Sequence, residues 1–220
     1  MINSRKNLAY CALVLLFPML VMVSSTGCIR QMAQLLYVIK GHQVPAKFPG
    51  LEGKRVAVVC VSDESAYGPD TLTYTVSKLV CIKLAQGLKK GEVISPGKVE
   101  SWIDEYGWDP SEVVTLGKDL EAEAVLVIEI GSYSIHEGAT IFKGRADLTT
   151  TVYDIEKDGQ ITFSFGPDEY SFPENGRAAI QTSDRKFEAF YLARLTDHIS
   201  KLFVPHDKME SFADDAMSDW

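Results

Sequence analysis

Arg55-Val-Ala-Val-Val-Cys-Val-Ser62 is a nearly continuous run of apolar and mostly β-branched residues, and Ala124-Val-Leu-Val-Ile-Glu-Ile130 is a second. A strand with one face in water alternates apolar and polar side chains, and these two runs hardly do so. Continuous apolar runs of this length are typical of strands that helices cover on both faces. The two stretches therefore predict the centre of an α/β domain.

The segments around these two strands predict the remaining elements. Apolar residues recur at intervals of four through residues 70–90, as in a helix that packs on a core. Ser95-Pro96 and Asp109-Pro110 each place a helix cap before a proline, the usual start of a helix. Lys157-Asp158-Gly159 predicts the turn of a hairpin. The expected elements beyond the first strand are a helix at 70–90, a strand at 93–94, helices at 98–106 and 110–122, a strand at 124–130 with a continuation toward 135, strands at 140–155 and 160–165, a loop at 166–176 and a helix at 184–203.

The resulting order, β-α-β-α-α-β-β-β-α, predicts the fold class. We expect one α/β sandwich, with a mixed sheet whose early strands are parallel, an antiparallel hairpin, and helices packed on the sheet. The expected division of the chain is a lipoprotein signal peptide at 1–27, a lipid-anchored tether at 28–52, the α/β domain at 53–203 and an acidic mobile tail at 204–220.

The N-terminus has the pattern of a secretory signal. Arg5 and Lys6 supply positive charge, residues 8–23 are uncharged and mostly apolar, and small residues follow up to Cys28. An uncleaved membrane span is the competing interpretation, because such a span needs about 20 apolar residues. Pro18 interrupts the run, and this favours a cleaved signal.

Ser25-Thr26-Gly27-Cys28 resembles the lipobox of bacterial lipoproteins, although Ser25 replaces the usual leucine. The resemblance implies that the Cys28 thiol receives diacylglycerol and that cleavage frees the Cys28 amine, which can be acylated as well. Two or three acyl chains hold a protein on a membrane durably. Ile29 follows where some bacteria use aspartate to retain lipoproteins in the inner membrane, so we expect the outer membrane. An ordinary exported protein cut nearby is the alternative.

The charge of the chain argues against some partners. The formal net charge is −8, and removal of residues 1–27 lowers the number of basic residues from 22 to 20 against 30 acidic ones, which gives −10. Nucleic acids select basic surfaces, so no nucleic-acid partner is predicted.

Cysteine and histidine residues give no metal or cofactor site. After loss of the signal and lipidation of Cys28, Cys60 and Cys81 remain, and buried unpaired thiols are favoured over the disulfide that export would permit. No two histidines lie at metal-ligand spacing on one element, and His198 is expected as a hydrogen-bonded core residue. The sequence therefore predicts no cofactor, no metal and no catalytic residue.

Polar residues follow the first strand, where open α/β sheets gather their ligands. A solvated loop is the competing interpretation for this segment. The candidate ligand-binding residues are Ser62, Asp63, Glu64, Ser65 and Tyr67.

The acidic tail contains apolar side chains that suit a short docking peptide which becomes ordered on binding. A tail that only solvates the chain end is the alternative. The candidate docking residues are Phe212, Met217 and Trp220.

Three stretches carry a family resemblance: Gly53-Lys-Arg-Val-Ala-Val-Val, Leu116-Gly-Lys-Asp-Leu-Glu-Ala-Glu-Ala-Val-Leu-Val-Ile-Glu-Ile and Val152-Tyr-Asp-Ile-Glu-Lys-Asp-Gly159. With them, residues 53–203 resemble the envelope lipoproteins grouped around the curli-secretion lipoprotein, the TolB N-terminal domain and the lipoprotein activators of penicillin-binding proteins. The resemblance implies a mixed α/β sandwich that binds partners or assembles. The curli pore spans its membrane with long extra hairpins, whereas only His136-Glu-Gly-Ala-Thr140 interrupts the corresponding strands here.

We therefore predict a non-catalytic envelope lipoprotein that acts as an adaptor or assembly factor through protein–protein contacts. Its expected partners are a membrane, through the acyl anchor on Cys28, and another envelope protein, and a homo-oligomer stays open. The first alternative is a periplasmic enzyme or small-ligand receptor that uses a cleft near Ser62–Tyr67. The second is a pore-forming secretion subunit.

Overall fold

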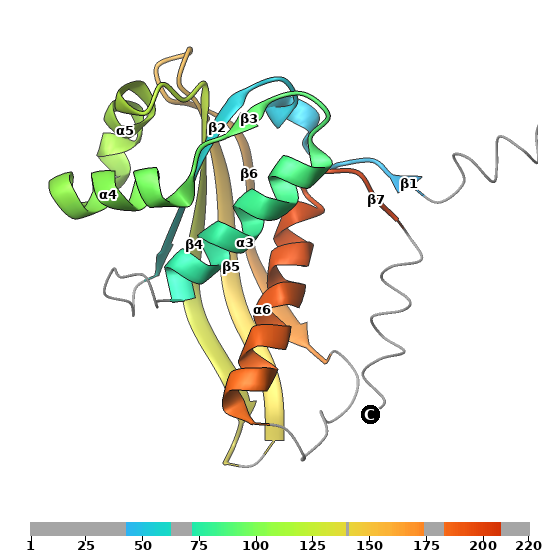
Figure 1. Ribbon diagram of the computed structural model, residues 1–220. Helices are drawn as coiled ribbons and strands as arrows, with labels where there is room; N and C mark the ends of the chain where they lie inside the picture. The colour runs from blue at the N-terminus through green and yellow to red at the C-terminus, as the bar shows by residue number, and fades with distance from the viewer. Residues whose placement is uncertain (1–42, 63–71, 140, 174–182, 208–220) are drawn as a thin grey trace, which may run out of the picture. The chain divides into compact units, whose positions relative to one another are not determined.

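The computed structural model describes residues 43–62, 72–139, 141–173 and 183–207 (Figure 1). The chain divides into two compact units, 1–43 and 44–220, and the fold below is that of the second. Across the described ranges, no helix has the length and apolarity that crossing a membrane requires. The elements are β1 (Gln43–Val44), η1 (Pro49–Leu51), β2 (Arg55–Ser62), α3 (Leu72–Gly87), β3 (Glu92–Val93), α4 (Pro96–Tyr106), η2 (Pro110–Glu112), α5 (Val113–Asp119), β4 (Ala124–Glu137), β5 (Ile141–Asp154), β6 (Gln160–Phe172), α6 (Asp184–Ser200) and β7 (His206–Asp207).

The main sheet is mixed and has five strands in the order β3-β2-β4-β5-β6. Strand β2 runs parallel to β3 and β4, and β4, β5 and β6 are antiparallel to one another in turn. Strands β1 and β7 form a separate two-stranded sheet. The predicted order β-α-β-α-α-β-β-β-α and the predicted mixed sheet are confirmed.

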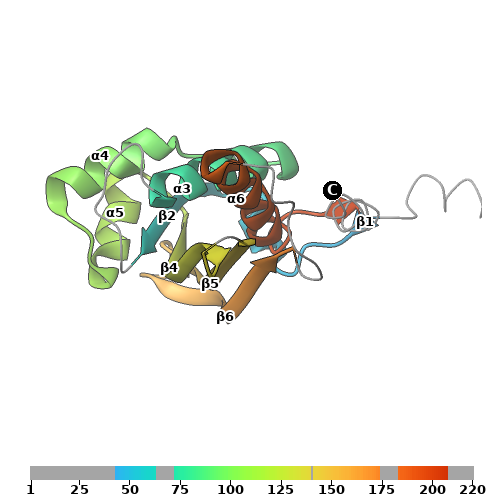
Figure 2. The same ribbon diagram turned by 90° about the horizontal axis from the view of Figure 1, so that it is seen from below.

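Helices cover both faces of the sheet, which explains the continuous apolar runs. In β2, Val56, Val58 and Cys60 face the core under α3 and α6. Ala57 and Val59 face the opposite core, under α4 and α5. Both halves of the alternating pattern are thus buried, as central strands of a covered sheet require. Figure 2 shows α4 and α5 at one end of the domain, α3 beside them, and α6 next to α3.

Helix α6 packs directly on β5. Tyr191 is fully buried, and its hydroxyl donates a hydrogen bond to the Tyr170 carbonyl oxygen at 3.1 Å. A Cβ atom on Gly144 would lie 2.2 Å from the Tyr191 ring, so the ring occupies the space that any other residue would need. The absence of a side chain at Gly144 sets how closely this helix approaches the sheet.

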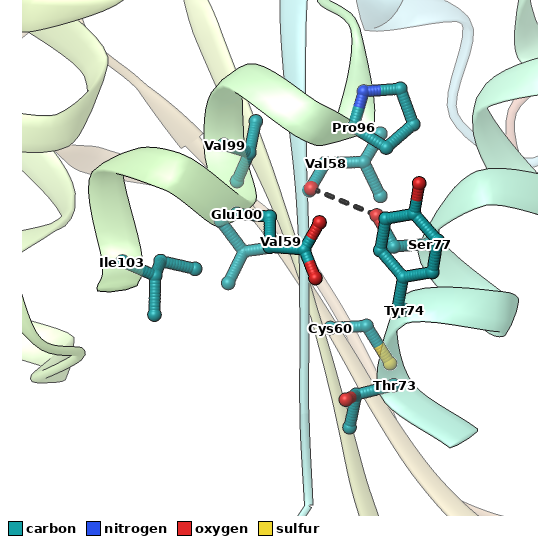
Figure 3. Close-up of a pocket in the computed structure, with 10 residues that line it drawn as sticks. All are labelled: Val58, Val59, Cys60, Thr73, Tyr74, Ser77, Pro96, Val99, Glu100 and Ile103. Atoms are coloured by element: carbon teal, nitrogen blue, oxygen red, sulfur yellow. Dashed lines mark hydrogen bonds between the residues drawn. The ribbon is translucent and has the colours of Figure 1, made fainter. Parts of the chain in front are cut away.

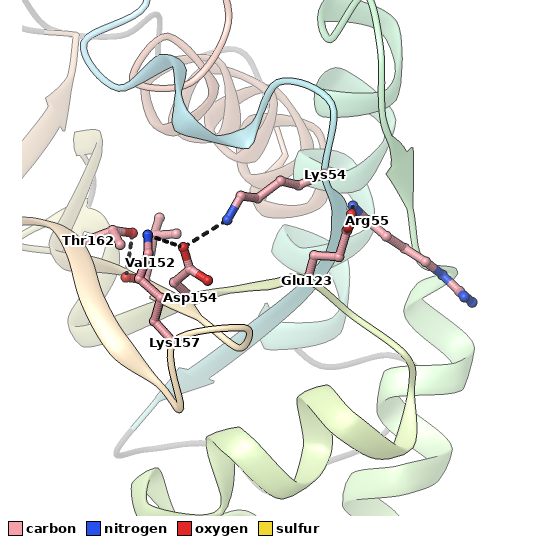
Figure 4. Close-up of polar contacts among 7 residues, drawn as sticks. All are labelled: Lys54, Arg55, Glu123, Val152, Asp154, Lys157 and Thr162. Carbon is pink, nitrogen blue, oxygen red and sulfur yellow. Dashed lines mark hydrogen bonds and ion pairs between the residues drawn. The ribbon is translucent and has the colours of Figure 1, made fainter.

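One polar cluster joins the start of β2 to the end of β5 (Figure 4). The Asp154 carboxylate is almost fully buried and accepts hydrogen bonds from Lys54 Nζ and Lys157 Nζ, each at 2.9 Å. Beside it, the Glu123 carboxylate accepts a hydrogen bond from the Arg55 backbone N–H at 2.7 Å. These contacts join the start of β2 to the end of β5 and to Glu123, the residue before β4.

Several element boundaries differ from the sequence prediction: β4 continues to Glu137, α6 ends at Ser200, and two further differences are larger. The stretch 166–172, expected within a loop, belongs to β6, where Tyr170 opposes Ala146 and Phe172 opposes Gly144. Proline is tolerated here because β6 is an edge strand and its pairing with β5 is irregular near Pro167. The helix expected at 110–122 is a 3₁₀ turn followed by the short helix α5.

Candidate functional site

Helices α4 and α5 cover only part of their face of the sheet. On that face β4 presents Val125, Val127, Glu129 and Gly131 in turn, because alternate residues of a strand point the same way. The first two are buried in the core under α4 and α5, whereas Glu129 and Gly131 are exposed. The sheet face therefore changes from apolar to polar where the helices end.

A groove of about 640 Å³ lies at this boundary. Strands β2, β4, β5 and β6 and the connection between α4 and α5 all contribute to it. We call it the sheet groove. Its lining residues are Val61, Ser62, Trp108, Pro110, Glu129, Ile130, Gly131, Asp147, Leu148, Thr149 and Pro167.

The groove has an acidic floor. Glu129 of β4 lies opposite Thr149 of β5. Asp147 lies two residues before Thr149 on the same strand. Ser132 Oγ donates a hydrogen bond to Asp147 Oδ2 at 2.6 Å and so holds this carboxylate. Burial, and next the charge of Glu129, raise the pKa of the Tyr153 hydroxyl above its ordinary value. Among the described residues, the lining includes two carboxylates and no basic side chain, so this part of the groove attracts cations.

An apolar wall stands beside this floor. Trp108 is half-buried and packs against the core under α4 and α5. The next residue, Asp109, caps η2 by accepting a hydrogen bond from the Ser111 backbone N–H at 2.8 Å. This cap and Pro110 fix the connection that carries Trp108. The groove thus combines an aromatic wall with a negatively charged floor.

The structure places one predicted ligand-binding residue in the groove. Ser62, the last residue of β2, is part of the lining. The other four candidates, Asp63, Glu64, Ser65 and Tyr67, lie outside the described residues, as does Cys28. The tail residues Phe212, Met217 and Trp220 also lie outside the described range.

The sequence interpretation missed the residues from β4, β5 and the α4–α5 connection. One signal for them was available: Glu129 is the only charged residue in the apolar run Ala124–Ile130. A carboxylate at that position indicates that one face of the strand opens to water there. Asp147 and Trp108 carry no comparable signal, because only the folded register brings them near Glu129.

A second, much smaller cavity of about 30 Å³ lies between α3 and α4 beside β2 (Figure 3). Its volume fits about one water molecule. Ser77 Oγ donates a hydrogen bond to the Val58 carbonyl oxygen at 3.2 Å, and Cys60 lies beside this contact in the cavity lining. The cavity is too small for an organic ligand.

Both cysteines of the domain are buried free thiols, as predicted. Burial raises the pKa of the Cys81 thiol to about 12 and raises the pKa of Cys60 still further. A thiol reacts as its thiolate, so burial keeps both side chains unreactive at neutral pH.

His198 differs from its predicted core position. Its side chain is 35% exposed, lies 2.6 Å from Asp168 Oδ2 through Nε2, and stacks on the Tyr170 ring. The helical spacing places His198 on the apolar stripe of α6, but edge strand β6 leaves that side partly open. The predicted hydrogen bond is present, and the predicted core position is wrong. Within the described ranges, no three histidine, cysteine, aspartate or glutamate side chains are grouped as metal ligands.

The sequence matches no known protein-family model and no curated protein. Its fold is similar to that of several solved structures. The PelC dodecamer from Paraburkholderia phytofirmans is 11% identical, with 74% of this chain and 95% of that chain covered and a TM-score of 0.44. Lipoprotein GNA1162 from Neisseria meningitidis is 15% identical, with 66% and 97% covered and a TM-score of 0.43. The LpoB C-terminal domain from Salmonella enterica is 14% identical, with 56% and 84% covered and a TM-score of 0.36.

Proposed function

We propose that this protein is a lipid-anchored adaptor of the bacterial cell envelope that docks a segment of another envelope protein in the sheet groove. Cys28 and the lipobox-like residues before it support the anchor. The observation that carries the docking function is the uncovered part of the sheet face, where Glu129 and Asp147 lie beside Trp108.

The shape of the groove supports an extended segment as the occupant. It crosses four strands and has an apolar wall along an acidic floor. Tryptophan is enriched among the residues that dominate binding at protein interfaces. Carboxylates beside it favour basic side chains, and such complementarity governs specificity and the association rate. A partner segment with lysine or arginine next to an apolar residue fits both surfaces.

The experiment is a crosslinking pull-down from intact envelopes with wild type and groove variants. Asp147→Lys reverses the charge of an exposed groove residue, and Thr149→Arg adds a bulky cation beside it. Glu156→Lys is the matched control, because Glu156 is exposed in the turn between β5 and β6, away from the groove lining.

Wild type and Glu156→Lys should recover the same partner, and both groove variants should recover much less of it. Unchanged melting temperatures would show that the groove variants still fold. Equal recovery by all four proteins would contradict the docking proposal.

A small-ligand receptor or periplasmic enzyme is the second candidate, and one observation favours it. The groove volume lies in the range of small-molecule sites, about 300–1,000 Å³, and Ser62 lines it. The triple variant Asp63→Ala, Glu64→Ala and Ser65→Ala separates the two candidates. The adaptor should retain partner recovery and function in this variant. Loss of function with folding, anchoring and partner recovery intact would favour the ligand site.

A further inference from the structure

Two helical segments of the domain carry opposite charges. The segment 96–123, which contains α4 and α5, has eight acidic residues and two lysines. The segment 72–90, which contains α3, has four lysines and no acidic residue. Helix α4 lies on one side of α3 in Figure 2, and α6 lies on the other. The surface of the domain therefore has an acidic part and a basic part next to each other.

The basic part has a ridge with an apolar centre. Lys78, Ile82, Gln86 and Lys89 recur at intervals of three or four along and just beyond α3, so they form one stripe. All four are exposed, and Ile82, at 44%, is one of four large apolar side chains that the described residues expose. We call this stripe the α3 ridge. The ion pairs of the described residues include neither Lys78 nor Lys89.

The acidic part has a hollow with an aromatic floor. A depression of about 680 Å³ on α4 and the end of α5 is lined in part by Trp102, Glu105, Tyr106 and Asp119, and Lys98 is the one basic residue of its described lining. We call it the α4 hollow. Tyr106 is 64% exposed, and its ring centroid lies 5.1 Å from that of Trp102. Trp102 Nε1 donates a hydrogen bond to Asp119 Oδ2 at 2.9 Å, which fixes the indole in the floor.

The ridge and the hollow are largely complementary in charge, and each has an exposed apolar centre. The ridge presents an isoleucine between lysines. The hollow presents the exposed ring of Tyr106 beside two carboxylates and Lys98, and the nearly buried Trp102 lies beneath. Burial of Ile82 against Tyr106 would remove exposed apolar surface of both side chains from water. A lysine ammonium near these rings and Glu105 would gain both cation–π and ion-pair attraction. Aromatic anchors surrounded by charged residues are the usual composition of a protein interface.

We infer that the α3 ridge of one copy docks in the α4 hollow of a second copy of this chain. The two surfaces differ, so the contact is heterologous and leaves a free ridge and a free hollow on the outer copies. Such contacts propagate into a closed ring or an open filament, depending on the rotation between copies. Neither surface is part of the sheet groove, so this assembly is independent of partner docking.

Sedimentation velocity of the full chain, purified from envelopes in detergent, tests this inference. The ridge variant combines Lys78→Glu with Lys89→Glu, and the hollow variant combines Glu105→Lys with Asp119→Lys, both in the lining of the hollow. All four side chains are exposed. The control combines Arg185→Glu with Lys186→Glu, an equal charge reversal on exposed residues of α6.

Wild type and control should sediment as assemblies of more than one copy, and each of the other variants should sediment as a single copy. An equimolar mixture of the ridge and hollow variants should associate again, because each reversed surface then meets an oppositely charged one. This recovery also shows that both variants fold. A wild type that stays a single copy at every concentration, or a mixture that fails to associate, would overturn the inference.

Discussion

Asp154 shows how one residue joins distant parts of the chain. Its carboxylate is 4% exposed and ion-paired with Lys54 and Lys157 (Figure 4). Hydrogen bonds from Lys54 and then Lys157 lower its pKa from 3.8 to about 2. The folded state therefore favours the ionised carboxylate more than the unfolded state does. This difference stabilises the fold above about pH 4, and the stabilisation is lost as the pH falls toward 2.

Asp154→Asn removes this titrating group. We expect the free energy of unfolding at pH 7 to fall by about 1–2 kcal/mol, because the two lysines lose their charged partner. The variant should also lose less stability than wild type between pH 4 and pH 2. Urea unfolding across this pH range measures both effects. Parallel curves for wild type and variant would show that the ion pairs do not stabilise the fold.

Gly159 ends the turn between β5 and β6 with φ = +80°, in the region that glycine favours. A Cβ atom there would also lie 2.5 Å from Val114 Cγ2. We expect Gly159→Val to lower the free energy of unfolding by about 1–3 kcal/mol. Gly53→Val is a matched control, since Gly53 has φ = +81° but no atom within 4 Å of its Cβ position.

The two glycine variants separate backbone strain from steric overlap. Gly53→Val should be destabilised by strain alone and therefore by less than Gly159→Val. Thermal unfolding of both variants checks this order. A melting temperature of Gly159→Val equal to that of wild type would mean that the turn has another geometry.

At the scale of elements, Gly144 sets the contact between β5 and α6. The fully buried ring of Tyr191 occupies the space over Gly144. Gly144→Ala should move α6 away from the sheet and destabilise the domain by about 1–3 kcal/mol, as overpacking does. Gly131→Ala on β4 is the control, because its nearest neighbour would be Asp147 Cβ at 3.8 Å. In denaturant unfolding, Gly144→Ala should be less stable than Gly131→Ala. Equal stability of the two variants would contradict the packing described for α6.

The elements that the sequence predicted best are those whose local pattern agrees with their burial. Residues 55–62 form β2 as expected, and the hairpin turn falls at Lys157–Gly159, between β5 and β6. The stretch 166–172 was predicted wrongly because Gly166 and Pro167 are typical of loops. Pairing with β5 on an edge strand overrides this local preference, and the sequence alone gives no sign of it.

The sheet groove was predicted only in part, for a similar reason. Ser62 follows a recognisable strand, and the carboxyl ends of parallel strands are known positions of ligand sites. Asp147 belongs to a strand expected to alternate, and its place beside Glu129 depends on the register of β4 with β5. Trp108 enters through a connection whose position depends on how α4 packs. Residues brought together by three separate elements leave no common local pattern.

At the scale of the whole molecule, the proposed adaptor has two functional ends: the anchor at Cys28 and the sheet groove. Cys28→Ala should prevent lipid attachment and leave an uncleaved or mislocalised precursor, because the lipobox-like motif requires the thiol. Metabolic labelling with a radioactive fatty acid, followed by envelope fractionation, measures both effects. Recovery of the labelled acyl chain on the Ala variant would rule out Cys28 as the attachment site.

Fractionation of the wild-type protein tests its expected membrane. Ile29 lacks the negative charge that marks inner-membrane retention in some bacteria, so the protein should appear in the outer-membrane fraction of a density gradient. A protein found wholly in the inner-membrane fraction would contradict this expectation.

The central claim is that another envelope protein occupies the sheet groove, and site-specific photocrosslinking in living cells tests it most directly. A benzophenone amino acid would replace Thr149 in the groove lining or Glu156 in the exposed turn as control. We expect one discrete protein adduct from position 149, none from position 156, and loss of the adduct when Asp147→Lys is added. No adduct from position 149, or an adduct that Asp147→Lys leaves unchanged, would contradict it.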